Sequence, residues 1–188
     1  MVKLHIGCGA RVLRDWVNID LAYDSNETHR RAYGDEPSSL GGMEDFIAID
    51  VVKEPLPFPD GSVDVIFHED FLEHLDQRSQ ILFLAETLRV LKPGGGHRVN
   101  TPSLLQMRRH SDFSKGLRGV CVSPEWDRWH HKNVLTPLSL EELALMVGYS
   151  SIIFNGRDQS VFAEHLPHEY RPGPDRCEDE NIFADLIK

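Results

Sequence analysis

Short apolar runs alternate with polar turns along most of this chain, and each run has the length of a buried strand. Strands are predicted at residues 3–6, 16–20, 46–50, 63–67, 96–100, 151–154 and 181–187. A different period marks one segment, in which Ile81, Leu84, Ala85, Leu88 and Leu91 form a single stripe of a 3.6-residue repeat. Strands interleaved with helical segments predict an α/β fold around a mostly parallel sheet.

Two helices have predicted ends. The first follows Asp76, a residue type that favours the N-cap, and stops at the Pro93–Gly96 turn. The second begins at Ser139, where Ser139–Glu142 matches a capping box and Leu138 and Leu143 are placed as a hydrophobic staple. It is expected to end at Gly148. The stretch 101–136 has no clear period, and we interpret it as an insertion above the sheet.

Length and composition narrow the class of protein. The 188 residues are expected to form a single domain, and 40% hydrophobic and 27% charged residues are typical of a folded protein. No apolar run approaches the roughly 20 residues of a membrane-spanning helix, and no secretory signal precedes the first strand. We therefore expect a cytoplasmic protein that contacts no membrane. The net charge of −10 argues against nucleic acid as a partner, and the three scattered cysteines show no metal or redox spacing.

Candidate binding residues lie where the predicted strands end. Gly7–Gly9 follows the first strand, Asp20 ends the second and Asp50 ends the third. Ligands bind beyond the carboxyl ends of the strands of an open parallel sheet, so these groups are expected to face one site. Glycine allows close approach of the backbone to a ligand, and a carboxylate can accept hydrogen bonds from a ribose diol or an adenine amino group. Each signal alone is common in structural turns, whereas the set is not.

Several further motifs follow in a characteristic order. They are Ile6–Gly9, Trp16–Asp20, Pro55–Asp64 after Asp50, Phe71–Leu75 with its Glu-His-Leu triplet, Leu88–Gly95 with its Leu-Lys-Pro-Gly-Gly turn, and Ser139–Tyr149. Together they resemble the class I S-adenosylmethionine-dependent methyltransferases, in particular the small type 11-like group that acts on metabolites and saccharides. The resemblance covers most of the chain.

The resemblance implies a cofactor and a set of residues that hold it. S-adenosyl-L-methionine would lie on the turn of Gly7, Cys8 and Gly9, with its ribose on Asp20. Its adenine would lie by Asp50 and Val51, with His68 and Glu69 beside the methyl group. The sequence departs from the family pattern at three points. His5 replaces a common acid, Ala10 replaces a third glycine, and Asp20 comes only 11 positions after Gly9.

A general base is needed if the acceptor is a hydroxyl. His68 and His74 are the imidazoles near the end of the fourth strand, and imidazole titrates in the appropriate range. Both are therefore candidate catalytic residues. The alternative for Glu73 and His74 is a polar pair that fixes the loop after this strand by hydrogen bonds.

The insertion at 101–136 is expected to act as a lid. Trp126, Trp129, His130 and His131 could stack on an acceptor and exclude water. The alternative is an apolar plug that tethers a long loop. His130, His131, His165 and His168 show no recognisable ligand spacing, so no metal is predicted.

These observations predict a three-layer α/β sandwich with a Rossmann-like methyltransferase sheet. It has about seven mostly parallel strands, and the last is inserted antiparallel. The predicted activity is methyl transfer to a small molecule or saccharide. The sequence is compatible with either a monomer or a homo-oligomer. One alternative is a Rossmann-type dinucleotide-binding oxidoreductase, although the fuller G-x-G-x-x-G is missing after Gly7. The other is a non-catalytic module that binds S-adenosylmethionine.

Overall fold

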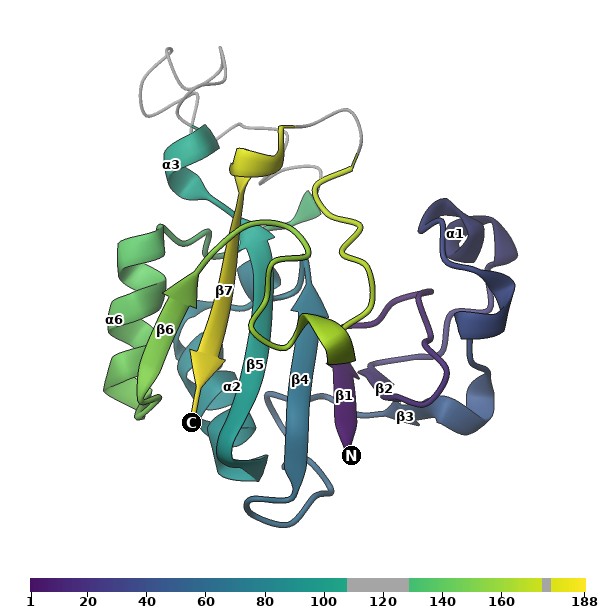
Figure 1. The fold of residues 1–188 in the computed structure, drawn as a ribbon, viewed down its shortest axis with the longest axis horizontal. Helices are drawn as coiled ribbons and strands as arrows, with labels where there is room; N and C mark the ends of the chain where they lie inside the picture. The colour runs from purple at the N-terminus through teal and green to yellow at the C-terminus, as the bar shows by residue number, and fades with distance from the viewer. Residues whose placement is uncertain (108–128, 174–176) are drawn as a thin grey trace.

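The architecture is that of a seven-stranded, mostly parallel sheet, seen in a computed structural model that describes residues 1–107, 129–173 and 177–188. The strands are β1 (Lys3–Ile6), β2 (Val17–Asp20), β3 (Phe46–Ala48), β4 (Val63–Glu69), β5 (Leu91–Pro102), β6 (Ser151–Phe154) and β7 (Asn181–Ile187). Their order is β3-β2-β1-β4-β5-β7-β6 (Figure 1). β7 is antiparallel to both of its neighbours. The predicted sheet, including the inserted last strand, is confirmed.

Two helices cover one face of this sheet, α2 (Gln77–Val90) and α6 (Pro137–Val147) (Figure 1). α1 (Glu27–Ala32) buries no residue, and α3 (Leu104–Met107) is a single turn. The main core lies between the sheet and α2 and α6, and includes Leu4, Ile66, Phe83 and Leu140. None of the helices in the described ranges is long and apolar enough to cross a membrane.

The start of α2 is as predicted, but its buried stripe is rotated. Asp76 is the N-cap and accepts a hydrogen bond from the Ser79 backbone N–H at 2.8 Å. Ala85 is exposed, whereas Gln80 and Thr87 are buried. These polar side chains tolerate burial because their hydrogen bonds are satisfied. The Gln80 amide donates to two backbone carbonyls, and the Thr87 hydroxyl bonds within its helix and to Tyr149.

The start of α6 differs from its prediction by three residues. Thr136 is the N-cap, and its hydroxyl accepts from the Ser139 backbone N–H while Ser139 Oγ accepts from the Thr136 N–H. Ser139 is therefore the third helical residue of the capping box instead of its first. Leu138 is 63% exposed, so the predicted staple is wrong. Gly148 ends the helix in a left-handed conformation (φ 118°), as expected.

The second face of the sheet is covered by irregular chain. The segment after β6 crosses this face (Figure 1). Its Phe162 and Leu166 pack on a small cluster of Leu13, Trp16, Val65 and Phe67. The short β1–β2 connection contains no helix that could cover this cluster. The buried Asn18 side chain holds the connection in place instead. Its Oδ1 accepts from the Leu13 N–H, and its Nδ2 donates to the carbonyls of Leu13 and Asp45.

Two fully buried arginines attach the covering segment to the sheet. Arg98 in β5 forms a two-pronged ion pair with Glu169 (2.9 and 2.8 Å) and a second pair with Asp185 in β7 (3.2 Å). Arg11 binds Glu69 at the end of β4 (2.6 Å), Asp35, and the His168 carbonyl. A buried ion pair is strongly destabilising when one partner is removed, because the other charge is left without compensation.

We therefore predict that Arg98→Met lowers the free energy of unfolding by about 3–5 kcal/mol, because it strands the carboxylates of Glu169 and Asp185. Arg31→Met is the matched control, since the Arg31 side chain is 81% exposed and its pair with Glu27 is 4.0 Å long. It should change stability by no more than about 0.5 kcal/mol. Urea unfolding of both variants measures the difference. Equal, small effects would show that the covering segment does not depend on Arg98.

Candidate active site

A cleft opens at the carboxyl edge of the sheet, where sequence analysis placed the ligand. Its volume is about 80 Å³, and its walls are Ile6, Gly7, Ile19, Asp20, Leu21, Ile49, Asp50, Val51, Val52, Phe71 and Leu75. β1, β2 and the segment after β3 supply one wall, and the chain after β4 supplies Phe71 and Leu75. The structure thus brings four predicted residues, Gly7, Asp20, Asp50 and Val51, into one apolar cleft that carries two carboxylates.

The glycine turn after β1 has the conformation that its residues predict. Gly7 and Gly9 have φ of +66° and +51°, in the left-handed region that favours glycine. A Cβ at Gly7 would overlap the Phe71 ring, so this position also lacks space for a side chain. The Gly9 backbone N–H donates to Asp20 Oδ2 at 2.8 Å and fixes the orientation of this carboxylate. Cys8 is buried, and burial raises the pKa of its thiol, which makes it an inert packing residue.

The carboxylates of the cleft are oriented by neighbouring groups. Asp20 Oδ1 also accepts from the Leu21 backbone N–H at 2.7 Å. Asp50 lies 2.7 Å from the Lys53 ammonium, and this contact lowers the pKa of the Asp50 carboxyl. An ionised carboxylate offers about four acceptor positions, so each retains capacity for a ligand hydroxyl or amino group. The cleft therefore fits the nucleoside part of a cofactor such as S-adenosylmethionine.

His68 and Glu69 are not among the residues that line this cleft. His68 is fully buried on the α2 side of β4, where Nδ1 bonds His97 Nε2 at 2.9 Å. Burial lowers the pKa of His68 to about 3. Glu69 points to the opposite face and accepts from Arg11, Asn100 and the Tyr170 and Arg171 backbone. Alternation along β4 explains this arrangement, because neighbouring side chains of a strand take opposite faces.

His74 and His131 come together outside the cleft. His74 ends the 3-10 turn Leu72–His74, between the cleft residues Phe71 and Leu75, and its ring meets that of His131 edge to face at 4.9 Å. Burial and Lys132 lower the pKa of His74. Trp129 and His130 are exposed, and none of residues 129–131 lines the cleft. Trp126 and most of the predicted lid lie outside the described residues.

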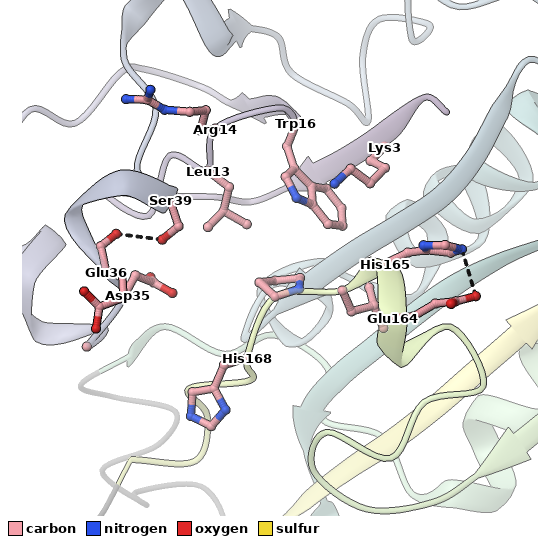
Figure 2. Close-up of a pocket in the computed structure, with 13 residues that line it drawn as sticks. Lys3, Leu13, Arg14, Trp16, Asp35, Glu36, Ser39, Glu164, His165 and His168 are labelled. Carbon is pink, nitrogen blue, oxygen red and sulfur yellow. Dashed lines mark hydrogen bonds and ion pairs between the residues drawn. The ribbon is translucent and has the colours of Figure 1, made fainter.

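Sequence reasoning missed Glu73, the buried partner of these histidines. Glu73 was interpreted only as part of a polar pair. Its burial could not be predicted, because a glutamate in a turn is normally exposed to solvent. His165 and His168 lie elsewhere, at a second pocket of about 580 Å³ on the face that carries Trp16 and Lys3 (Figure 2). Arg14, Asp35 and Glu36 also line this second pocket.

Comparison with known proteins identifies the family. Residues 4–98, half of the chain, match the family described as "Methyltransferase domain". The chain belongs to this methyltransferase family. The matched range contains every residue of the cleft, and the cofactor of the family is S-adenosyl-L-methionine.

Two curated relatives match different lengths of this methyltransferase. A probable S-adenosylmethionine-dependent methyltransferase of Mycolicibacterium smegmatis is 36% identical over 94 residues, which are 50% of this chain and 31% of that protein. A dimethylglycine N-methyltransferase of Parasynechococcus marenigrum is 26% identical over 144 residues, 76% of this chain and 46% of that protein. The chain thus spans less than half the length of either relative.

Solved structures share the fold. A methyltransferase of Methanosarcina mazei superposes with a TM-score of 0.60 at 18% identity, covering 98% of this chain and 89% of that one. One from Archaeoglobus fulgidus gives a TM-score of 0.59 at 13% identity, covering 99% and 85%. Both are described as S-adenosylmethionine-dependent, and the predicted Rossmann-like methyltransferase fold is confirmed.

The buried titratable groups of this methyltransferase predict its acid stability. Burial lowers the pKa of His5 and of His68 to about 3, and lowers the pKa of His97 well below its usual value. The unfolded chain therefore binds three more protons than the native state below pH 6.5, and stability falls as pH falls. Burial raises the pKa of Glu69 to about 7 and that of Glu73 well above its usual value, which has the opposite effect between pH 7 and 4.5.

We predict a shallow loss between pH 6.5 and 4.5, because the raised pKa values of Glu69 and Glu73 offset part of the effect of the three histidines. Below pH 4.5 the carboxyls are protonated in both states, and the loss should steepen to about 4 kcal/mol per pH unit. Urea unfolding at a series of pH values measures both slopes. A free energy of unfolding at pH 4 equal to that at pH 7 would contradict the assignment of neutral buried histidines.

Proposed function

We propose that this domain transfers a methyl group from S-adenosylmethionine to a small-molecule or saccharide acceptor. The observation that carries the proposal is the cleft itself, an apolar slot bounded by a left-handed glycine turn and by two carboxylates. A Rossmann-type oxidoreductase would bind the pyrophosphate of its dinucleotide at a helix N-terminus after the glycine turn. The chain between Gly9 and Val17 contains no helix, which argues against that alternative. Family membership favours methyl transfer over that alternative and over a module that only binds the cofactor.

Each residue of the cleft takes a role that its contacts support. Asp20, oriented by the Gly9 and Leu21 N–H groups, accepts hydrogen bonds from the ribose hydroxyls. Asp50 accepts from the adenine amino group, and Val51 with Ile49 packs on the apolar faces of the ring. Gly7 gives the backbone room beside the amino-acid part. Gly9 acts through Asp20, since its N–H is already used by that carboxylate.

The chemistry of the donor limits what the protein must supply. S-adenosylmethionine provides an activated methyl group on a sulfonium, so the chain mainly has to align an acceptor lone pair with it. His68 cannot serve as base, because it is fully buried behind the cleft. His74 is the remaining candidate base among the predicted residues, and its lowered pKa keeps the imidazole neutral at pH 7. An amine acceptor in its free-base form would need alignment alone.

The charge of the protein favours a neutral or cationic acceptor. The net charge of the whole chain is −10. A phosphate backbone would meet like charge here. The relative named dimethylglycine N-methyltransferase carries a small amine substrate in its name, which supports a small acceptor.

We predict that Asp20→Ala weakens binding of S-adenosylhomocysteine by about 1.5–3 kcal/mol, the range for hydrogen bonds to a charged group. Asp60→Ala is the control, because Asp60 is an 81% exposed carboxylate that pairs with Arg89. Calorimetric titration should give wild-type affinity for the control only. If folded Asp20→Ala binds as tightly as wild type, the cofactor does not lie in this cleft.

A screen that detects S-adenosylhomocysteine formation tests the acceptor class. Small amines, saccharides, RNA, DNA and peptides are offered separately with S-adenosylmethionine. Turnover is expected with an amine or a saccharide and not with nucleic acid. Turnover confined to nucleic acid or peptides would overturn the small-acceptor assignment while leaving the cofactor cleft intact.

A further inference from the structure

Glu73, His74 and His131 form a cluster beside the cleft, and two of its members, Glu73 and His131, have no role in the methyl transfer proposed above. Glu73 and His74 belong to the 3-10 turn after β4, and His131 lies in the segment that leads to α6. One ligand atom from each residue lies within 4.8 Å of the other two. Because the ligands come from two distant stretches of sequence, no regular motif spacing reveals them.

One oxygen of the buried Glu73 carboxylate has no hydrogen-bond partner. Its side chain is fully buried, and Oε2 accepts a hydrogen bond from Thr101 Oγ1 at 2.8 Å. Oε1 is buried without any hydrogen bond. His131 Nε2 lies 3.8 Å from this oxygen, too far for a hydrogen bond. A buried carboxylate without compensation is costly, so this oxygen requires a proton or a cation.

The framework around the cluster is fixed by hydrogen bonds. The Glu73 carbonyl accepts from the backbone N–H groups of Lys132 (2.7 Å) and Asn133 (3.1 Å), which attaches the His131 segment to the turn. Gln80 and Asn133 also bond to each other through their side chains at 2.7 Å. This arrangement holds the imidazole and the carboxylate in place before any ligand binds, as metal sites require.

Backbone strain occurs on both sides of the cluster. Asp70, just before the turn, and His130, just before His131, have left-handed φ of 46° and 57°. Such conformations are unfavourable for non-glycine residues and persist where the surrounding structure imposes them, often at functional sites. Here they aim two separate segments at one point.

We propose that Glu73, His74 and His131 bind one divalent transition-metal ion, with Zn²⁺ as the best match. Two imidazoles and one carboxylate are a common ligand set for zinc with an open fourth position, whereas Mg²⁺ and Ca²⁺ prefer oxygen ligands alone. Ligand atoms of a tetrahedral zinc lie about 3.4 Å apart. The 3.8 Å between Glu73 Oε1 and His131 Nε2 needs only a small contraction, and the histidine rings are nearly perpendicular at 83°.

The proposed ion would lie beside the cofactor cleft, because the turn that carries Glu73 and His74 is flanked by the cleft residues Phe71 and Leu75. Binding of the ion would occupy a ring nitrogen of His74, and a role of His74 as general base would then be excluded. The site does not depend on methyl transfer, so it can be tested without an acceptor. The alternative that needs no ion is a protonated Glu73 packed against the two histidines.

The test is metal titration of chelator-treated protein. Calorimetry with ZnCl₂ should show one ion per chain, and Co²⁺ should give the visible absorption of a four-coordinate nitrogen and oxygen site. Glu73→Gln and His131→Ala should each weaken Zn²⁺ binding at least tenfold. His165→Ala is the matched control, since His165 also lies beside a glutamate (Glu164, 3.3 Å) but at the second pocket (Figure 2). It should bind Zn²⁺ as wild type does.

Folding of the variants is checked by thermal unfolding without metal. Glu73→Gln keeps the shape of the side chain and removes the buried charge, so its melting temperature should equal or exceed that of wild type. If His131→Ala fails to fold, His74→Ala replaces it. The proposal is overturned if wild type takes up no stoichiometric ion, or if the folded variants bind Zn²⁺ as wild type does. Affinity for S-adenosylhomocysteine, measured on the same samples, separates this outcome from failure of the cofactor cleft.

Discussion

Two buried arginines hold together a sheet that lacks a helix on one side. The connection between β1 and β2 is too short for a full helix, so the cluster around Trp16 and Phe67 needs another cover. The segment after β6 supplies it, and irregular chain has no amphipathic face with which to hold itself down. Arg98 and Arg11 provide the attachment through carboxylates from four different stretches of chain. The cost of burying these charges is tolerable because every guanidinium is paired.

The same constraint positions the cofactor cleft. Arg11 follows the glycine turn directly, and its bond to Glu69 ties that turn to the end of β4. Asn18 closes the short connection from the other side. The turn therefore stays at the carboxyl edge, where Gly9 can orient Asp20, although no helix stabilises it from behind. His5, in the place of a common acid, bonds Asn18 and stacks on Phe67 instead of facing the cleft.

The strands could be predicted from the sequence because each is a contiguous apolar run with a local stop signal. The helix faces could not, because Gln80 and Thr87 are buried only through partners that are distant in sequence. Gly7, Asp20 and Asp50 were predictable as a site because strand ends converge in a parallel sheet. The burial of His68 could not be predicted, since a residue one position past a predicted strand end can point to either side. The cluster of Glu73, His74 and His131 could not be predicted from the sequence, because only the folded chain brings His131 to the turn after β4.

The central claim is that the cleft between Asp20 and Asp50 holds the cofactor. The most direct measurement is a crystal structure of the protein grown with S-adenosylhomocysteine. The account predicts density for the nucleoside in this cleft, with both ribose hydroxyls on Asp20 and the adenine amino group on Asp50. Density for the nucleoside in the second pocket beside Trp16 and Lys3, with the cleft empty, would contradict it (Figure 2).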